Sequence, residues 1–276
     1  MRLGGASVIL SWGAARSGGA YSSKRGTVEM AFDYSSSPDP IRDDLAEAHR
    51  RAWRHIEAPG TWLNGAERVA VAEETRRART CALCAERKGA LSPDSVAGEH
   101  APVGVLPAAL VEEVHRVTTD PARLTRAWRD RLIEEGITDE AYVEALGVAV
   151  LVISVDEFHR ALDLPLEPLP ESQPGDPTRV RPEGLVEGDA WVPMIGPGQV
   201  EALGLEGLPK VPGARLPNVL RGLSLVPEEV RAWLDLSASQ YLPPAGMRRF
   251  ETEGALDRSQ IELVAGRVSA LNECFY

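Results

Sequence analysis

The prolines of this chain are distributed unevenly, and their distribution limits what the chain can fold into. Eleven of the 21 prolines lie between Pro165 and Pro217, among many glycines. Proline removes a backbone donor and breaks a helix interior, so no continuous helix can cross this stretch. We therefore expect a Pro/Gly-rich linker over residues 165–217, partly in the polyproline II conformation, with a folded unit on each side.

The sequence on both sides of this linker has the periodicity of helices, and aromatic residues make up only 5% of the chain. Apolar residues recur at helical spacing, in segments that begin near Asp39, Ala66, Pro107, Pro121, Asp139, Pro227 and Leu256. We predict an all-α fold with four parts: a disordered tail or mis-assigned start over 1–38, a helical unit over 39–164, the linker over 165–217, and a second unit over 218–276 that is incomplete at its C-terminus.

Charge and hydropathy exclude some classes of function. The formal net charge is −11, and no run of lysine or arginine offers a groove for nucleic acid. The longest apolar run, over 145–155, is too short to span a bilayer and is typical of a buried helix. A signal peptide is conceivable in the first thirty residues, but glycine, serine and tryptophan interrupt its apolar patch, and Met30 would make a good start. We expect a cytoplasmic protein without a membrane or nucleic-acid partner.

Three cysteines are too few for a disulfide scaffold. Two of them, Cys81 and Cys84, have the Cys-x-x-Cys spacing, which in a cytosolic protein indicates redox chemistry or metal binding before structure. Thr80 is a plausible N-cap that would place both thiols in a first helical turn, where the helix dipole favours the thiolate.

Two other interpretations of the pair stay open. The cysteines could be half of a zinc site that His100 and His115 complete, although the chain has no second Cys-x-x-Cys and no closely spaced histidine pair. They could also be inert buried thiols. The interpretation that we favour needs neither a metal nor a cofactor. Outside the cysteine pair, we expect His49 and His55 to be solvated on helix surfaces and Trp53 to pack in the core.

The segment before Cys274 is related to the segment before Cys81. With an offset of 193 residues, the apolar positions before the two cysteines have the same helical phase, although identity is low. The C-terminal segment resembles the core of the AhpD-like (carboxymuconolactone decarboxylase) superfamily over about twenty residues. The resemblance is carried by a helix with arginine and glutamate that leads through Ser-x-x-Asn to a cysteine, at Arg258, Glu262, Ser269, Asn272 and Cys274.

The first half matches this pattern less closely, because Val69 stands at the glutamate position and Lys88 at the histidine position. The resemblance implies an all-α, oligomeric protein of a superfamily that contains thiol-dependent peroxidases and also decarboxylases that lack the cysteine pair. It also implies that Glu262 accepts a proton. The candidate catalytic residues are therefore Cys81, Cys84, Cys274 and Glu262.

We predict a thiol-dependent protein that reduces hydroperoxides or disulfides, with a dithiol protein as its reductant, and a homo-oligomer. The rival hypothesis is a non-catalytic helical scaffold or a degenerate decarboxylase-like protein. The chain ends two residues after Cys274, where the pattern requires the second redox residue. We expect that the natural protein continues there with selenocysteine; a frameshift, a shortened version or a true C-terminus are the alternatives.

Overall fold

The protein is all-α, as predicted. The computed structural model describes residues 31–104, 106–187, 190–196, 203, 217–242 and 256–271. The helices are α1 (Asp43–Glu57), α2 (Gly65–Ala78), α3 (Ala82–Gly89), α4 (Ala108–Thr119), α5 (Arg126–Glu134), α6 (Asp139–Ala161), α7 (Asn218–Arg221), α8 (Pro227–Gln240) and α9 (Arg258–Leu271), with 3-10 turns η2 (Pro93–Ser95) and η3 (Pro121–Arg123). The regular β structure in this part is one antiparallel pair, β1 (Leu185–Val186) and β2 (Met194–Ile195).

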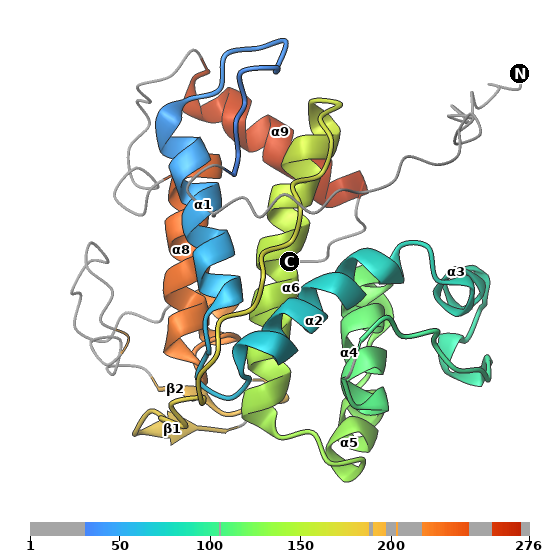
Figure 1. Cartoon of the computed structure of the whole chain (residues 1–276). Helices are drawn as coiled ribbons and strands as arrows, with labels where there is room; N and C mark the ends of the chain where they lie inside the picture. Colours follow the sequence, from blue (N-terminus) through green and yellow to red (C-terminus); the bar gives the residue numbers. More distant parts are fainter. Residues whose placement is uncertain are drawn as a thin grey trace, which may run out of the picture.

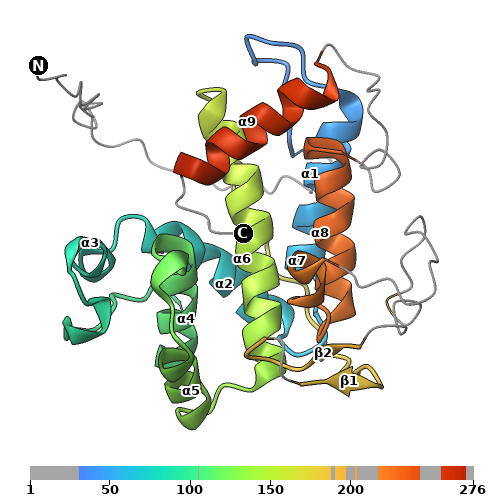
Figure 2. The same ribbon diagram turned by 180° about the vertical axis from the view of Figure 1, so that it is seen from behind.

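Helix α6 lies at the centre of the molecule (Figure 1). It packs against α2 and α4 on one side and against α8 and α1 on the other, and α1 runs alongside α8 (Figure 2). These helices cover α6 on both sides, and its residues Val148, Leu151 and Val152 therefore have no exposed surface. The apolar run that was too short for a bilayer is thus a buried helix, as predicted. None of the helices that the structure describes has the length and apolar composition to cross a membrane.

The proline-rich stretch contains no helix over residues 165–187, but it is held against the helical core. The amide of Gln173 donates to the carbonyl of Glu57 (2.7 Å), and the amide of Arg179 donates to that of Thr61 (2.8 Å). Beyond it, Leu220 of α7 and Leu236 of α8 belong to the same hydrophobic core as α1 and α6. Residues 218–240, which the sequence assigned to a second unit, therefore share one core with the first.

Arg68 of α2 joins four elements from inside this core. Its guanidinium forms ion pairs with Glu144 of α6 and Glu229 of α8 (2.8 Å), and it donates to the carbonyl of His55 at the end of α1 (3.0 Å). All three charged side chains are at most 1% exposed. Glu144 also accepts the amides of Thr61 (3.1 Å) and Trp62 (2.6 Å), which fixes the loop before α2.

Two glycines leave room for this charged cluster. A Cβ atom at Gly147 would lie 2.6 Å from a carboxylate oxygen of Glu229, and one at Gly60 would overlap Glu144 and Arg68. Glycine at position 147 costs about 1 kcal/mol relative to alanine in a helix interior. Its presence in α6 is explained by the close approach of the Glu229 side chain.

The segment before α1 packs into the core. Phe32 is 1% exposed and lies edge-on to Trp53, with ring centroids 5.1 Å apart, while the Tyr34 hydroxyl lies 2.5 Å from His49 Nδ1 and 2.9 Å from His159 Nε2. Phe32 and Tyr34 fall within the stretch 1–38 that the sequence assigned to a tail. The expectation that His49 is solvated was wrong, because these aromatic residues cover it completely. Residues 1–30 lie outside the described part.

Helix α9 contrasts with α2, its proposed counterpart in the internal repeat. The alignment pairs Val71 with Val264, yet Val71 is fully buried and Val264 is 58% exposed. No residue of α9 is buried. The shared helical phase therefore corresponds to different surroundings in the two segments.

The first prediction concerns Arg68. We expect Arg68→Met to lower the free energy of unfolding by about 3–5 kcal/mol, because it removes the buried cation that Glu144 and Glu229 share. Urea denaturation measures the change. Arg51→Met is the matched control: Arg51 pairs with Asp235 between α1 and α8 at 2.7 Å, but both side chains are at least 40% exposed, so we expect less than about 1 kcal/mol. Equal losses in the two variants would contradict the role assigned to the buried cluster.

The second prediction concerns His49. Burial, with a contribution from His159, lowers the pKa of His49 to about 3. The unfolded chain, where the histidine pKa is about 6.5, therefore binds one more proton between these two values, and folding weakens as the pH falls. Because of His49, we expect the free energy of unfolding of the wild type to fall by about 1.4 kcal/mol per pH unit below pH ~6. We expect this decrease to be absent in His49→Gln. Urea midpoints at pH 6.5 and 5.0 measure this slope, and a variant as acid-sensitive as the wild type would show that His49 is not its source.

Candidate functional site

Cys81, Cys84, His100 and His115 meet at one end of α3. Cys84 Sγ lies 3.3 Å from His115 Nδ1 and 3.7 Å from His100 Nδ1, and Cys81 Sγ lies 3.4 Å from the same His100 nitrogen. One donor atom from each residue lies within 4.8 Å of the other three. Both cysteines are free thiols, and the two imidazole rings have centroids 4.1 Å apart. The histidines come from the loop after η2 and from α4.

The local sequence explains why both thiols face the same point. Helix α2 ends at Ala78, and Cys81 is the extended N-cap residue of α3 (φ −73°, ψ 123°), which places Cys84 in the first turn. The prediction that the cysteine pair stands at the start of a helix is confirmed, but the first-turn position predicted for Cys81 is wrong, because Cys81 is itself the N-cap residue. Thr80 is not the N-cap, because its hydroxyl donates to the carbonyl of Arg77 at the end of α2 (3.2 Å).

Each histidine of the cluster is backed by a glutamate. His100 Nε2 lies 2.7 Å from Glu112 Oε2, and His115 Nε2 lies 3.0 Å from Glu74 Oε2. Glu74 is fully buried, and its other oxygen accepts the amide of Val103 (2.7 Å). Because the carboxylates accept from Nε2, the unprotonated Nδ1 of each ring faces the sulfur atoms in the neutral tautomer.

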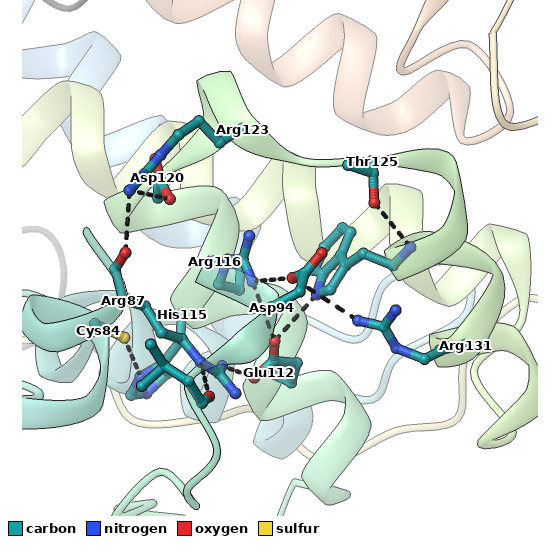
Figure 3. Close-up of polar contacts among 12 residues, drawn as sticks. Cys84, Arg87, Asp94, Glu112, His115, Arg116, Asp120, Arg123, Thr125 and Arg131 are labelled. Carbon is teal, nitrogen blue, oxygen red and sulfur yellow. Dashed lines mark hydrogen bonds and ion pairs between the residues drawn. The ribbon is translucent and has the colours of Figure 1, made fainter. Parts of the chain in front are cut away.

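Glu112 connects the cluster to its surroundings (Figure 3). It accepts hydrogen bonds from Arg87 (2.7 Å) and from the indole of Trp128 (3.0 Å), and Arg116 lies 3.9 Å away. Burial alone would raise the pKa of Glu112, but the bonds from His100, Arg87 and Trp128 outweigh it and lower the pKa to about 2. Glu112 is therefore a permanent negative charge behind His100.

The charges within the cluster influence one another. Burial opposes protonation of His100, yet its bonds with Cys84, Glu112 and Cys81 raise its pKa to about 10. Burial would raise the pKa of Cys81, but the neighbouring His100 and Cys84 lower it below its ordinary value. For His115 burial prevails over the bond with Glu74, so its pKa is lowered. Without another cation, the site favours an imidazolium at His100 beside thiolate character at Cys81.

Helix α3 has little apolar packing of its own. Cys81, Leu83 and Cys84 form a small buried cluster with Val96, separate from the main hydrophobic core. Polar contacts supply much of the attachment: besides the Arg87–Glu112 pair, Arg123 donates to the carbonyls of Ala90, Arg87 and Lys88 at the end of α3. Figures 1 and 2 show α3 projecting from the helical body. The cysteine–histidine cluster lies at the junction between the two.

The structure brings together only two of the four predicted site residues. Cys81 and Cys84 meet the two histidines that the sequence offered as alternative metal ligands. Glu262 is exposed on α9, where it accepts the Tyr241 hydroxyl (2.6 Å) and pairs with Arg258, so it is not part of this cluster. Cys274 lies outside the described residues. Glu74 and Glu112 were missed, because no sequence pattern pairs them with His115 and His100.

This set of side chains supports two kinds of chemistry. Two neighbouring thiols with imidazole bases beside them can be oxidised to a disulfide and reduced again. Two thiolates and two imidazoles can also hold a borderline-soft cation. Comparison with protein-family models, with curated proteins and with solved structures finds no match to this chain. The functional argument therefore depends on the geometry of the cluster.

Two adjacent glutamates of α4 supply the third prediction. Glu112→Gln removes the charge that faces His100 and Arg87, so we expect a loss of about 1–3 kcal/mol in the free energy of unfolding. Glu113 is the matched control: it is fully buried without a hydrogen-bond partner, and burial raises its pKa well above the ordinary value. Because burial opposes the charged form of Glu113, its replacement by a neutral glutamine removes no favourable charge interaction, and we expect Glu113→Gln to lose no stability. Thermal denaturation at pH 7 compares the two, and a larger loss in Glu113→Gln would contradict this account.

Proposed function

We propose that this chain is a thiol–disulfide redox protein of AhpD-like type, which reduces small hydroperoxides or disulfides through Cys81 and Cys84. The observation that carries the proposal is that each thiol faces an imidazole whose other nitrogen is bonded to a glutamate: Cys84 with His115 and Glu74, and Cys81 with His100 and Glu112. Such relays orient a base at the thiol proton. Inert core thiols do not need them, which weighs against the scaffold hypothesis.

The residues suggest a two-step reaction with a hydroperoxide. Cys81 lies at the N-cap of α3 and is the more exposed thiol, 7% against 2% for Cys84. Its sulfur attacks the terminal peroxide oxygen, the O–O bond breaks, and the alkoxide leaves as an alcohol with the thiol proton delivered through His100. The product is a sulfenic acid at Cys81.

The second step closes the disulfide. The Cys84 sulfur attacks the sulfenic sulfur, the S–O bond breaks, and the hydroxide leaves as water with the Cys84 proton, which passes through His115. A dithiol reductant then returns two electrons and two protons, and is itself oxidised to a disulfide. The overall reaction converts one hydroperoxide and one dithiol into one alcohol, one water molecule and one disulfide.

The resemblance in the C-terminal segment is consistent with this type of chemistry, but it concerns Glu262 and Cys274. The site around Cys81 and Cys84 would use a proton relay other than the one that the family pattern implies. Val69 and Lys88 stand where the family pattern has glutamate and histidine, and the relay of this site would consist of Glu74 and His115 instead. The disulfide-reducing variant of the function needs the same residues without the peroxide step.

The fourth prediction tests the redox function with metal-free, reduced protein in a Cys274→Ser background. We expect one equivalent of an alkyl hydroperoxide to remove two free thiols and to lower the mass of the Cys81–Cys84 peptide by two hydrogens. A dithiol should restore both thiols. We expect His115→Gln to slow disulfide formation about 100-fold, because the general base is lost.

The matched control for this experiment is His159→Gln, which alters another buried histidine whose partners are Tyr34 and the carbonyl of Pro165. It should form the disulfide at the wild-type rate. If both thiols stay free in wild-type protein while the peroxide persists, the redox proposal fails and the scaffold hypothesis gains. A rate that is equal in His115→Gln and the wild type would remove His115 from the mechanism.

A further inference from the structure

We propose that the reduced cluster of Cys81, Cys84, His100 and His115 binds one Zn²⁺ ion as a closed, four-ligand structural site. The inference goes beyond redox chemistry and does not depend on it. Of the described residues, these four are the group whose donor atoms converge in this way. They come from three places along the chain, the start of α3, the loop after η2 and α4, so the ion would connect all three.

The distances between the donor atoms match those around tetrahedral zinc. Zn–S bonds of about 2.3 Å and Zn–N bonds of about 2.0–2.1 Å place the sulfur and nitrogen ligands of a tetrahedron about 3.6 Å apart. Three of the four sulfur–nitrogen separations in the cluster are 3.3, 3.4 and 3.7 Å, and all four donor atoms lie within 4.8 Å of one another. The cluster therefore has the size of a zinc coordination sphere, with little rearrangement needed to admit the ion.

The orientation of both histidines is that of metal ligands. Metal-binding histidines usually donate their other ring nitrogen to a carboxylate or a carbonyl, which fixes the tautomer and aims the lone pair at the metal. Here Glu112 and Glu74 accept from the Nε2 atoms, and both Nδ1 atoms face the sulfurs. Two carboxylate-backed imidazoles that converge on two thiols are also the ligand set of a Cys₂His₂ zinc site.

The charges balance when zinc replaces protons. Binding releases two protons and leaves two thiolates and two neutral imidazoles around Zn²⁺, so the coordination sphere is neutral. That matters because all four ligands have little or no contact with solvent: the His100 side chain is 6% exposed, and the others are at most 7%. The nearby Arg87 balances the charge of Glu112 behind His100.

The surrounding fold indicates what the ion does. Four protein ligands leave no open coordination position, which is typical of structural rather than catalytic zinc. The apolar cluster around α3 consists of the two cysteines, Leu83 and Val96, which is too small to hold a helix in place. The ion would supply the missing cohesion between residues 82–104 and α4. A disulfide would take away both thiolates, so zinc binding and oxidation of the pair exclude each other.

The fifth prediction is that the reduced full-length chain, in the Cys274→Ser background, binds one Zn²⁺ per molecule. Metal analysis after purification and titration of chelator-treated protein with Zn²⁺ against a chromophoric chelator measure the stoichiometry and affinity. Co²⁺ in place of Zn²⁺ should give the intense visible bands of a tetrahedral site with sulfur ligands. We expect Cys84→Ser and His115→Gln to weaken Zn²⁺ binding at least about 100-fold, and the positioning variant Glu74→Gln to weaken it about 10–100-fold at unchanged stoichiometry.

The control variants are His49→Gln and His159→Gln, which change buried histidines outside the cluster and should bind Zn²⁺ like the wild type. Far-UV circular dichroism identifies a variant that fails to fold, and the Co²⁺ spectrum of Glu74→Gln then reports on the site in a folded chain. Failure of the reduced wild type to bind Zn²⁺, or equal affinity in Cys84→Ser and the wild type, would overturn the inference. If the metal-free thiols are oxidised and reduced again but no Zn²⁺ binds, the redox proposal stands and the zinc inference fails. If Zn²⁺ binds but the metal-free thiols do not form a disulfide, the zinc inference stands and the redox proposal fails.

Discussion

The buried pairing of Arg68 with Glu144 and Glu229 is the interaction on which the arrangement of the helices depends. A charge inside a hydrophobic core is tolerated only where partners and hydrogen bonds compensate its lost hydration. Here α1, α2, α6 and α8 all contribute groups to that compensation, so each helix fixes the position of the others. Burial would raise the pKa of Glu229, but Arg68 and His55 outweigh it and lower the pKa to about 2, which keeps the carboxylate ionised.

Helix periodicity predicted most of the fold. The segments with apolar residues at helical spacing became helices close to the expected bounds, since burial of an apolar face needs only local sequence to be recognised. The environment of His49 could not be predicted, because it depends on Phe32 and Tyr34, which reach it from a stretch without helical periodicity. The packing of α8 could not be predicted either, because α8 follows the proline-rich linker in the sequence whereas its contact partners α1 and α6 precede it.

The site was predicted in part, for a related reason. The Cys-x-x-Cys spacing is local and therefore visible, and His100 and His115 entered as possible ligands only by their nearness in sequence. Glu74 and Glu112 lie 41 and 12 residues from the histidines that they support, and no pattern in one sequence identifies such partners. Glu262 was chosen from a family pattern, but its partners in the structure are Tyr241 and Arg258, so that role stays a prediction.

The separate packing of α3 has a consequence for how the molecule opens. The amide hydrogens of α6, which is covered on both sides, can exchange with solvent only when the whole core opens. Those of α3 depend on the few bonds around the cysteines and on Arg87 and Arg123, whose contacts hold the C-terminal end of the helix. Local opening of α3 therefore breaks fewer apolar contacts than opening of α6, and under the two proposals above the chemical state of two sulfur atoms would set how often α3 opens.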